Sequence, residues 1–288
     1  MAAEALRGAA TRSQAGSLEE YRSELGEICA KVLDAQPAMA PLVTLVRNVL
    51  ASVEASADLE AGRHAAIRTA EAFGSGLESR AESAAARAAA LMPPGGTVAT
   101  ISFSSTVRVT LVHEDARSIE QVICFESRPM REGEMLATAL AKAGVAVMFA
   151  VDAAASTLMA ECDMVLLGAD SIGDRGVVNK IGSAGLVDAA MRHGVPVMVV
   201  SDETKILPIG FPQHLADDRP PEEVWGAPAG VRVWNRYFEA FELERVTTVV
   251  TESAALSPVE VEELRRSIVP PPHVQAWADA RGRGTPDA

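Results

Sequence analysis

From residue 97 onward, short apolar runs alternate with stretches in which apolar residues recur at helical spacing. Strands that are buried on both faces read as continuous apolar runs, and their alternation with helices is typical of a parallel, doubly wound sheet. We therefore expect an α/β fold with a mainly parallel sheet. The expected strands are residues 97–102, 119–125, 145–150, 164–167, 195–200 and 247–251, with helices that include 134–142 and 184–193.

The preceding part of the chain has a different pattern, which is helical throughout. Ser17 and Glu20 form a capping box before a stripe of apolar residues at steps of three and four, and further helical stretches follow. The breaker cluster Pro93–Gly96 cannot continue a helix. We predict a helical N-terminal domain at residues 1–95 and a sheet domain at 96–288, with residues 270–288 as a surface extension or a frayed end.

Composition excludes several classes of partner. The formal net charge is −13, which repels nucleic-acid phosphate and anionic membrane surfaces. No apolar run reaches the 18 or so residues of a membrane span. Three scattered cysteines are too few for a disulfide framework or a zinc site, so we expect a cytoplasmic protein without metal ion or cofactor.

Open parallel sheets bind ligands beyond the carboxyl ends of their strands, so the residues after each apolar run are the candidates. Residues 102–106, Ser-Phe-Ser-Ser-Thr, follow the first run as a possible anion cradle that includes Ser104; the alternative is that these serines only cap the next helix. Arg128 follows the second run. It is suited to phosphate, and the alternative is a solvated arginine paired with Glu126 or Glu132.

The third and fourth runs are followed by aspartates. Asp152 is expected as a helix N-cap, with a ligand role as the alternative. Asp170 lies ten residues before Lys180, and Lys180 directly follows Asn179. Both ends of this segment carry glycines that let the backbone approach a ligand. For the segment 168–182 we favour a ligand site, with Asp170 as its chief polar residue.

These residues, in this order, resemble a family that contains ribose-1,5-bisphosphate isomerase, methylthioribose-1-phosphate isomerase and the regulatory subunits of translation initiation factor 2B. The resemblance spans nearly the whole chain. It rests on Glu126-Ser-Arg-Pro129, Val151-Asp152, Gly168-Ala-Asp170, Asn179-Lys-Ile-Gly182, Lys205, Val233-Trp-Asn235 and Val250-Thr-Glu252, with a weaker match at Met39-Ala-Pro-Leu42.

The resemblance implies a helical N-terminal domain and a Rossmann-like domain that binds a sugar phosphorylated at its anomeric carbon. In the isomerases, the aspartate that matches Asp170 assists ring opening, and the arginine that matches Arg128 contacts phosphate. Residues that match Asn179 and Lys180 contact the sugar. An N-terminal Arg-Gly pair also contributes, to which Arg7-Gly8 corresponds. Family members form dimers or hexamers, so a homo-oligomer is expected.

The chain departs from the isomerases in its first strand-end loop. Ser102 stands where they carry a catalytic cysteine, and Ile101 stands where a histidine is usual. A thiol with a pKa near ~8.5 supplies some thiolate at neutral pH, whereas an alcohol needs an adjacent base. Cys124 and Cys162 lie in or beside apolar runs, where buried structural cysteine is the commoner outcome.

Three functions therefore stay open. The first is an aldose–ketose isomerase acting on a phosphorylated pentose, with Asp170 and Ser102 in the catalytic positions. The second is a non-catalytic phosphosugar- or nucleotide-sensing subunit of the initiation-factor type, which the loss of the cysteine supports. The third is a structural subunit with a vestigial pocket. We favour a phosphosugar-binding member of the isomerase family.

Overall fold

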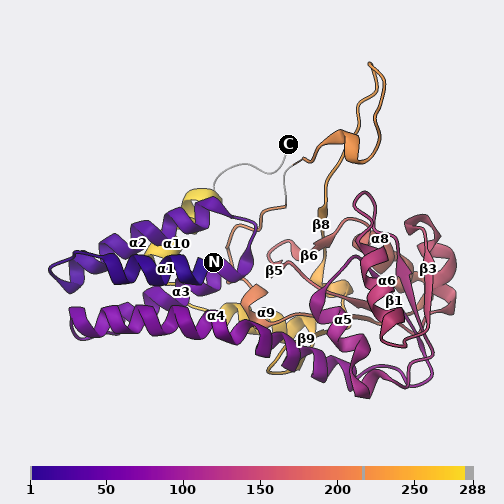
Figure 1. Cartoon of the computed structure of the whole chain (residues 1–288), viewed down its shortest axis with the longest axis horizontal. Helices are drawn as coiled ribbons and strands as arrows, with labels where there is room; N and C mark the ends of the chain where they lie inside the picture. Colours follow the sequence, from indigo (N-terminus) through magenta and orange to yellow (C-terminus); the bar gives the residue numbers. More distant parts are fainter. Residues whose placement is uncertain (1, 216–217, 283–288) are drawn as a thin grey trace. The chain divides into compact units, whose positions relative to one another are not determined.

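The computed structural model describes residues 2–215 and 218–282, and these form two compact units (Figure 1). One unit is helical and contains the chain up to Ser79, the segment Thr204–His214 and the residues from Glu263 onward. The other contains Arg80–Glu203 and Leu215–Glu262. The division falls inside the helix α4 (Leu59–Ala89), ahead of the Pro93–Gly96 turn where the sequence pattern changes.

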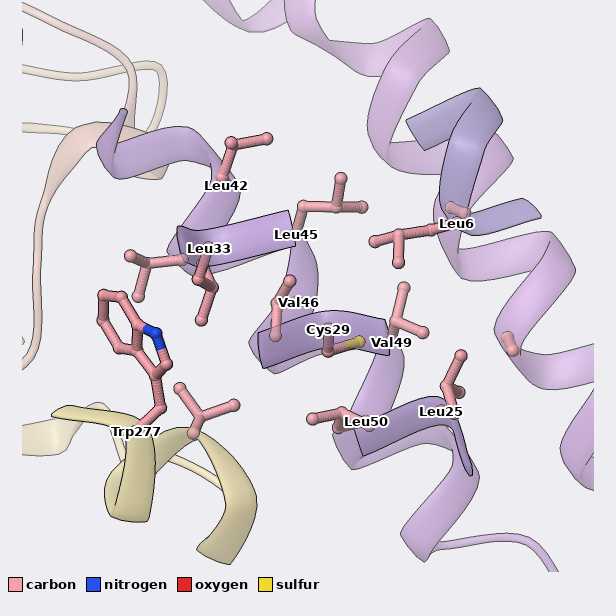
Figure 2. Packing of buried hydrophobic residues seen from close by; sticks show 14 of the residues in the cluster. Leu6, Leu25, Cys29, Leu33, Leu42, Leu45, Val46, Val49, Leu50 and Trp277 are labelled. Carbon is pink, nitrogen blue, oxygen red and sulfur yellow. The ribbon is translucent and has the colours of Figure 1, made fainter. Parts of the chain in front are cut away.

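The helical unit is built on α1 (Ala2–Arg12), α2 (Leu18–Ala35), α3 (Ala40–Glu54) and the first part of α4. The predicted capping box begins α2: Ser17 accepts a hydrogen bond from Glu20 N at 3.1 Å, and the Glu20 carboxylate accepts one from Gly16 N at 2.8 Å. Apolar residues spaced along one stripe of each helix meet in a common core, which includes Leu6, Leu25, Cys29, Leu45, Val46 and Val49 (Figure 2).

The C-terminal segment differs from the expected irregular tail. Residues Pro272–Gly282 form the helix α10, which packs against α2 and α3, while residues 283–288 lie outside the described part. Val274, Trp277 and Ala278 are buried in the helical core. Figure 2 shows Trp277 beside Leu33. The indole Nε1 of Trp277 donates to Asp34 Oδ1 at 2.8 Å. The last of the three prolines starts the helix, because proline is well suited to a first helical turn.

The second unit contains a seven-stranded sheet of order β10-β9-β7-β4-β1-β2-β3. All neighbours are parallel except the short edge strand β10, which is antiparallel to β9. The six strands predicted from the apolar runs are confirmed. Their bounds are β1 Thr97–Ile101, β2 Gln121–Phe125, β3 Val147–Ala150, β4 Met164–Leu167, β7 Val197–Val200 and β9 Thr248–Val250, with β10 at Ala255–Leu256.

Buried side chains cover both faces of this sheet, as the apolar runs predict. On one face Val98, Val122 and Leu166 pack with α5 and α6, and on the other Ala99, Ile123 and Val165 are equally buried. The helices are α5 Ser105–Val112, α6 Glu132–Lys142, α7 Ala155–Leu158, α8 Ser183–His193 and α9 Pro258–Ser267. Within the described residues, no helix of either unit combines the length and apolarity needed to cross a membrane.

A second, antiparallel sheet was not predicted. It has the order β5-β6-β8, with β5 at Ser171–Gly173, β6 at Gly176–Lys180 and β8 at Phe238–Phe241. The hairpin between β5 and β6 closes tightly at Gly176, where φ is +86° and an added Cβ would lie 2.1 Å from the carbonyl oxygen of Phe241. The candidate segment 168–182 is therefore mostly a β-hairpin that follows β4.

The packing of α10 yields a stability prediction. Trp277→Ala removes a buried indole and its hydrogen bond, so we expect the free energy of unfolding to fall by about 3–5 kcal/mol. Urea denaturation followed by circular dichroism measures this change. Val269→Ala, at a side chain that is 82% exposed just before α10, is the matched control and should change the free energy by less than about 0.5 kcal/mol. Equal midpoints for the two variants would show that α10 contributes nothing to the helical core.

Candidate functional site

The strand order reverses direction between β1 and β4. From β1 the chain adds β2 and β3 on one side, then returns to β4 on the other. In open α/β sheets, ligands bind beyond the carboxyl ends of the strands at such a reversal. Ser102 follows β1, Arg128 follows β2, Asp152 follows β3 and Asp170 follows β4, so the topology brings these candidates to one edge of the sheet.

Hydrogen bonds join the loops after β1, β2 and β3. Ser102 N donates to Ser127 Oγ at 2.6 Å, and both serines have a left-handed backbone, with φ of 71° and 65°. The Asp152 carboxylate accepts from the backbone N–H groups of Ser127 and Arg128, at 2.8 Å each. Asp152 therefore holds the neighbouring loop, and the prediction that it caps its own helix is wrong.

Ser104 caps the helix that follows it, which was the alternative given for the serine-rich loop. Its Oγ accepts from Val107 N at 3.3 Å and caps α5. An added Cβ on Gly168 would lie 2.8 Å from Ser104 Oγ, so only glycine lets the end of β4 pass this close to the first turn of α5. The loops on the two sides of the reversal are thus in contact. A ligand contact by Ser104 stays a prediction.

Asp170 begins the hairpin. Its backbone N–H donates to the carbonyl of Val178 at 2.8 Å, and the residue is exposed. The carboxylate is therefore within reach of a ligand at the sheet edge, while its backbone is fixed by the β5–β6 pairing. Its catalytic role stays a prediction.

Asn179 and Lys180 are both buried, and their side chains contact residues of two different helices. Asn179 Nδ2 donates to Ser183 Oγ at 3.0 Å, at the start of α8. Lys180 Nζ forms an ion pair with Glu132 Oε1 at 2.6 Å, at the start of α6, and lies 4.7 Å from the ring centroid of Tyr237. From the sequence, Glu132 was expected only as an alternative partner of Arg128.

A carboxylate accepts hydrogen bonds at the N-terminus of α8. Glu239 Oε1 on β8 accepts from Gly182 N and Ala184 N, at 2.8 Å each. Gly182 has φ of +99°, and an added Cβ would lie 2.8 Å from Ile101 Cδ1. The Asn179–Gly182 turn therefore packs onto the end of β1.

Arg128 is exposed, and its guanidinium has no carboxylate partner among the described residues. Its Nη2 donates to the backbone carbonyl of Val224 at 2.9 Å, and its Nη1 lies 3.5 Å from the carbonyl of Pro129. The alternative pairing with Glu126 or Glu132 is wrong. A charge that is held only by carbonyl oxygens is available to an anionic ligand, although phosphate binding by Arg128 stays a prediction.

A polar network around Tyr237 was missed. Tyr237 OH donates to Glu223 Oε2 at 2.6 Å, and Asn235 Nδ2 donates to the same oxygen at 2.9 Å. The hydrogen bond to Glu223, followed by burial, raises the pKa of Tyr237 to about 12. Arg219 lies 4.9 Å from the same ring. The residues of this network are scattered along the chain and give no periodic signal. Only Asn235 belongs to a motif that the sequence showed, the Val-Trp-Asn segment.

The cysteines are poor nucleophiles. Burial raises the pKa of Cys124 to about 12, and burial with the charges of Glu161 and Asp163 raises that of Cys162 to about 11. The interpretation of both as buried residues is confirmed. Among the described residues, no three side chains of His, Cys, Asp or Glu gather as they would around a metal ion.

Arg7 and Gly8 belong to α1 in the helical unit, whereas the other candidates belong to the sheet unit. Arg7 pairs with Glu71 at 3.2 Å across an exposed surface. Both residues line a surface pocket with Thr11, Arg12 and Ile67. Their predicted role in ligand binding stays a prediction.

Known proteins that are similar to this chain include two isomerases. A curated relative, the ribose 1,5-bisphosphate isomerase of Haloferax volcanii, is 29% identical over 99% of this chain and 91% of its own length. A bifunctional methylthioribose-1-phosphate isomerase/methylthioribulose-1-phosphate dehydratase of Nocardia farcinica, named as probable, is 36% identical over 54% of this chain and 31% of its own length.

A solved structure confirms the fold. The translation initiation factor eIF-2B of Pyrococcus horikoshii OT3 is 27% identical, with a TM-score of 0.72 over 90% of each chain. The sequence profile of the Initiation factor 2 subunit family matches residues 1–258. The resemblance inferred from the motifs is thus confirmed, and the chain belongs to the Initiation factor 2 subunit family.

Proposed function

We propose that the chain binds a pentose phosphorylated at its anomeric carbon at the strand-end edge between β1 and β4. The observation that carries this proposal is the position of Asp170 and Arg128 beyond neighbouring strands on either side of the reversal, one exposed carboxylate and one guanidinium without a carboxylate partner among the described residues. The similarity to a ribose 1,5-bisphosphate isomerase over nearly the full chain supports this class of ligand.

Each side chain has a role that its chemistry allows. Arg128 binds phosphate, because the guanidinium fork matches two phosphate oxygens. Asp170 acts as general acid or base at the sugar, for which an exposed carboxylate beside a ligand is suited. Asn179 and Lys180, at the end of β6, contact the sugar in this proposal.

Turnover as an aldose–ketose isomerase depends on Ser102. The hydroxyl replaces the thiol of the related isomerases, and no histidine lies in the Ser102–Thr106 loop to activate it. With Cys124 and Cys162 buried, the chain has no substitute thiol at this edge. This observation favours a second candidate function, a regulatory subunit that senses a phosphosugar without converting it.

We also propose that the chain self-associates. Trp225 and Trp234 are 56% and 54% exposed, with Val224 and Val231 exposed beside them in sequence. Tryptophan is enriched at the centres of protein interfaces, and exposed apolar side chains of this size favour association. A cytoplasmic location is proposed as well, because all three cysteines are free and buried.

Ligand binding is tested first. Ribose 1,5-bisphosphate and 5-methylthioribose 1-phosphate are added during thermal unfolding, and a ligand at about 100 times its Kd adds about 2.7 kcal/mol of stability, or several degrees of Tm. Arg128→Ala should weaken binding about tenfold or more. Arg131→Ala, in the same loop but paired with Glu134, is the control and should bind like the wild type. No shift with either sugar would contradict a phosphosugar site.

Turnover is tested by restoring the thiol. Ser102→Cys should raise ketose formation from ribose 1,5-bisphosphate about a hundredfold over the wild type. The rate should increase with pH up to the thiol pKa of about 8.5, because the thiolate is the reactive form. Ser105→Cys places a thiol nearby and should give no gain. Asp170→Asn in the Ser102→Cys background should remove the gain. If the thiol adds no activity, more than the nucleophile is missing and the sensing function is favoured.

Self-association is tested by light scattering after size-exclusion chromatography. We expect a mass of two or more 30.3 kDa chains at micromolar concentration. Trp225→Ser with Trp234→Ser should shift the protein toward a single chain, because burial of the two indoles is lost. A wild-type protein that elutes as one chain would rule the proposal out.

A further inference from the structure

Residues 218–234 form an exposed segment of the sheet unit, which we call the arm. The arm precedes Asn235 and β8 in the chain, and Figure 1 shows it as a long orange loop. No residue from 218 to 234 is buried, and the exposed side chains include Trp225 and Trp234. A segment without buried apolar contacts has little local stability of its own. The position of the arm therefore depends on the polar contacts at its base.

One carboxylate closes the base of the arm. Glu223 Oε2 accepts hydrogen bonds from Tyr237 OH at 2.6 Å and from Asn235 Nδ2 at 2.9 Å. The same nitrogen of Asn235 also donates to Pro220 O at 2.8 Å, and Arg219 N donates to Asn235 O at 2.9 Å. We call these hydrogen bonds the latch. They join the first residues of the arm to the residues that follow it.

The donor side of the latch is fixed to the second sheet. Tyr237 directly precedes β8, and its carbonyl accepts a hydrogen bond from Ile181 N at 2.8 Å. Asn235 is only 4% exposed. The hydrogen bond to Glu223, followed by burial, raises the pKa of Tyr237 to about 12, so the hydroxyl keeps its proton at neutral pH and remains a donor. Glu223 is therefore bound to a well-ordered part of the unit.

The residue after Glu223 connects the arm to the loop that follows β2. Val224 O accepts a hydrogen bond from Arg128 Nη2 at 2.9 Å. The direction of this carbonyl is fixed, because Trp225 N belongs to the same planar peptide group and donates to Pro221 O at 3.1 Å. An exposed arginine loses rotamer freedom when it binds a ligand, and an acceptor that already orients it reduces this loss.

We propose that Glu223 is a positioning residue for Arg128. The latch fixes the turn, the turn fixes the carbonyl of Val224, and that carbonyl orients the guanidinium for phosphate. A guanidinium has five N–H donors, so one hydrogen bond to Val224 O leaves donors for two phosphate oxygens. This inference rests on the proposed function and adds to it a residue that acts on the ligand only through Arg128.

The test is a double-mutant cycle in the whole chain, with the Kd of ribose 1,5-bisphosphate measured by calorimetry. Glu223→Ala opens the latch and should weaken binding about tenfold, close to the loss expected for Arg128→Ala. The double variant should bind no more than about twofold more weakly than Arg128→Ala alone, because the residue to be positioned is gone. Independent losses would instead multiply to about a hundredfold.

Milder variants keep the test valid if Glu223→Ala folds poorly. Glu223→Gln retains an acceptor oxygen for Tyr237 and Asn235, so its Kd should stay within about threefold of the wild type. Tyr237→Phe removes one donor of the latch, should give an intermediate loss, and allows the same cycle with Arg128→Ala. Glu222→Gln, at the exposed neighbouring carboxylate, is the matched control and should bind like the wild type. Tm and the mass by light scattering are recorded for each variant.

Three outcomes overturn the positioning role of Glu223 and leave phosphate binding by Arg128 intact. They are an unchanged Kd in Glu223→Ala, losses that multiply in the double variant, and a loss of affinity that occurs only together with a loss of oligomeric mass. A wild-type chain that does not bind ribose 1,5-bisphosphate, or an unchanged Kd in Arg128→Ala, overturns the proposed function itself and the inference with it.

Discussion

The carboxylate of Asp152 holds the edge of the sheet in its observed form. By accepting the backbone N–H groups of Ser127 and Arg128, it fixes the loop after β2, and Ser127 then fixes Ser102 after β1. Two of these residues have left-handed backbones, which cost about 1–3 kcal/mol each for residues other than glycine. The hydrogen bonds offset that strain, so the directions of Ser102 and Arg128 both depend on one aspartate.

Near this edge, the carboxylates bind internal donors, whereas Arg128 does not pair with a carboxylate among the described residues. Carboxylates satisfy the internal positions: Glu239 caps α8, Glu223 holds Tyr237, and Glu132 neutralises Lys180. Arg128 is instead held by a backbone carbonyl. In a chain with a net charge of −13, the guanidinium of Arg128 thereby stays without a carboxylate partner among the described residues, while the buried Lys180 is paired with Glu132.

The sequence predicted the parts of the fold that repeat. The six strands of the main sheet were evident because each is a continuous apolar run, and the strand-end rule then named the loops that follow β1, β2, β3 and β4. The hairpin at 168–182 was missed because β5 has only three residues, too few for any period to emerge. Asp152 and Glu132 were misjudged for a related reason: their partners come from other strands, and spacing along the chain carries no information about contacts between loops.

The packing of α10 into the helical core has a consequence for synthesis of the chain. The helical unit draws on both ends of the sequence, so α1, α2 and α3 emerge from the ribosome long before the helix that completes their core. The sheet unit is translated in full within that interval. Until residues 272–282 follow, the first helices expose part of an apolar surface. The helical unit is therefore the later of the two units to reach its final packing.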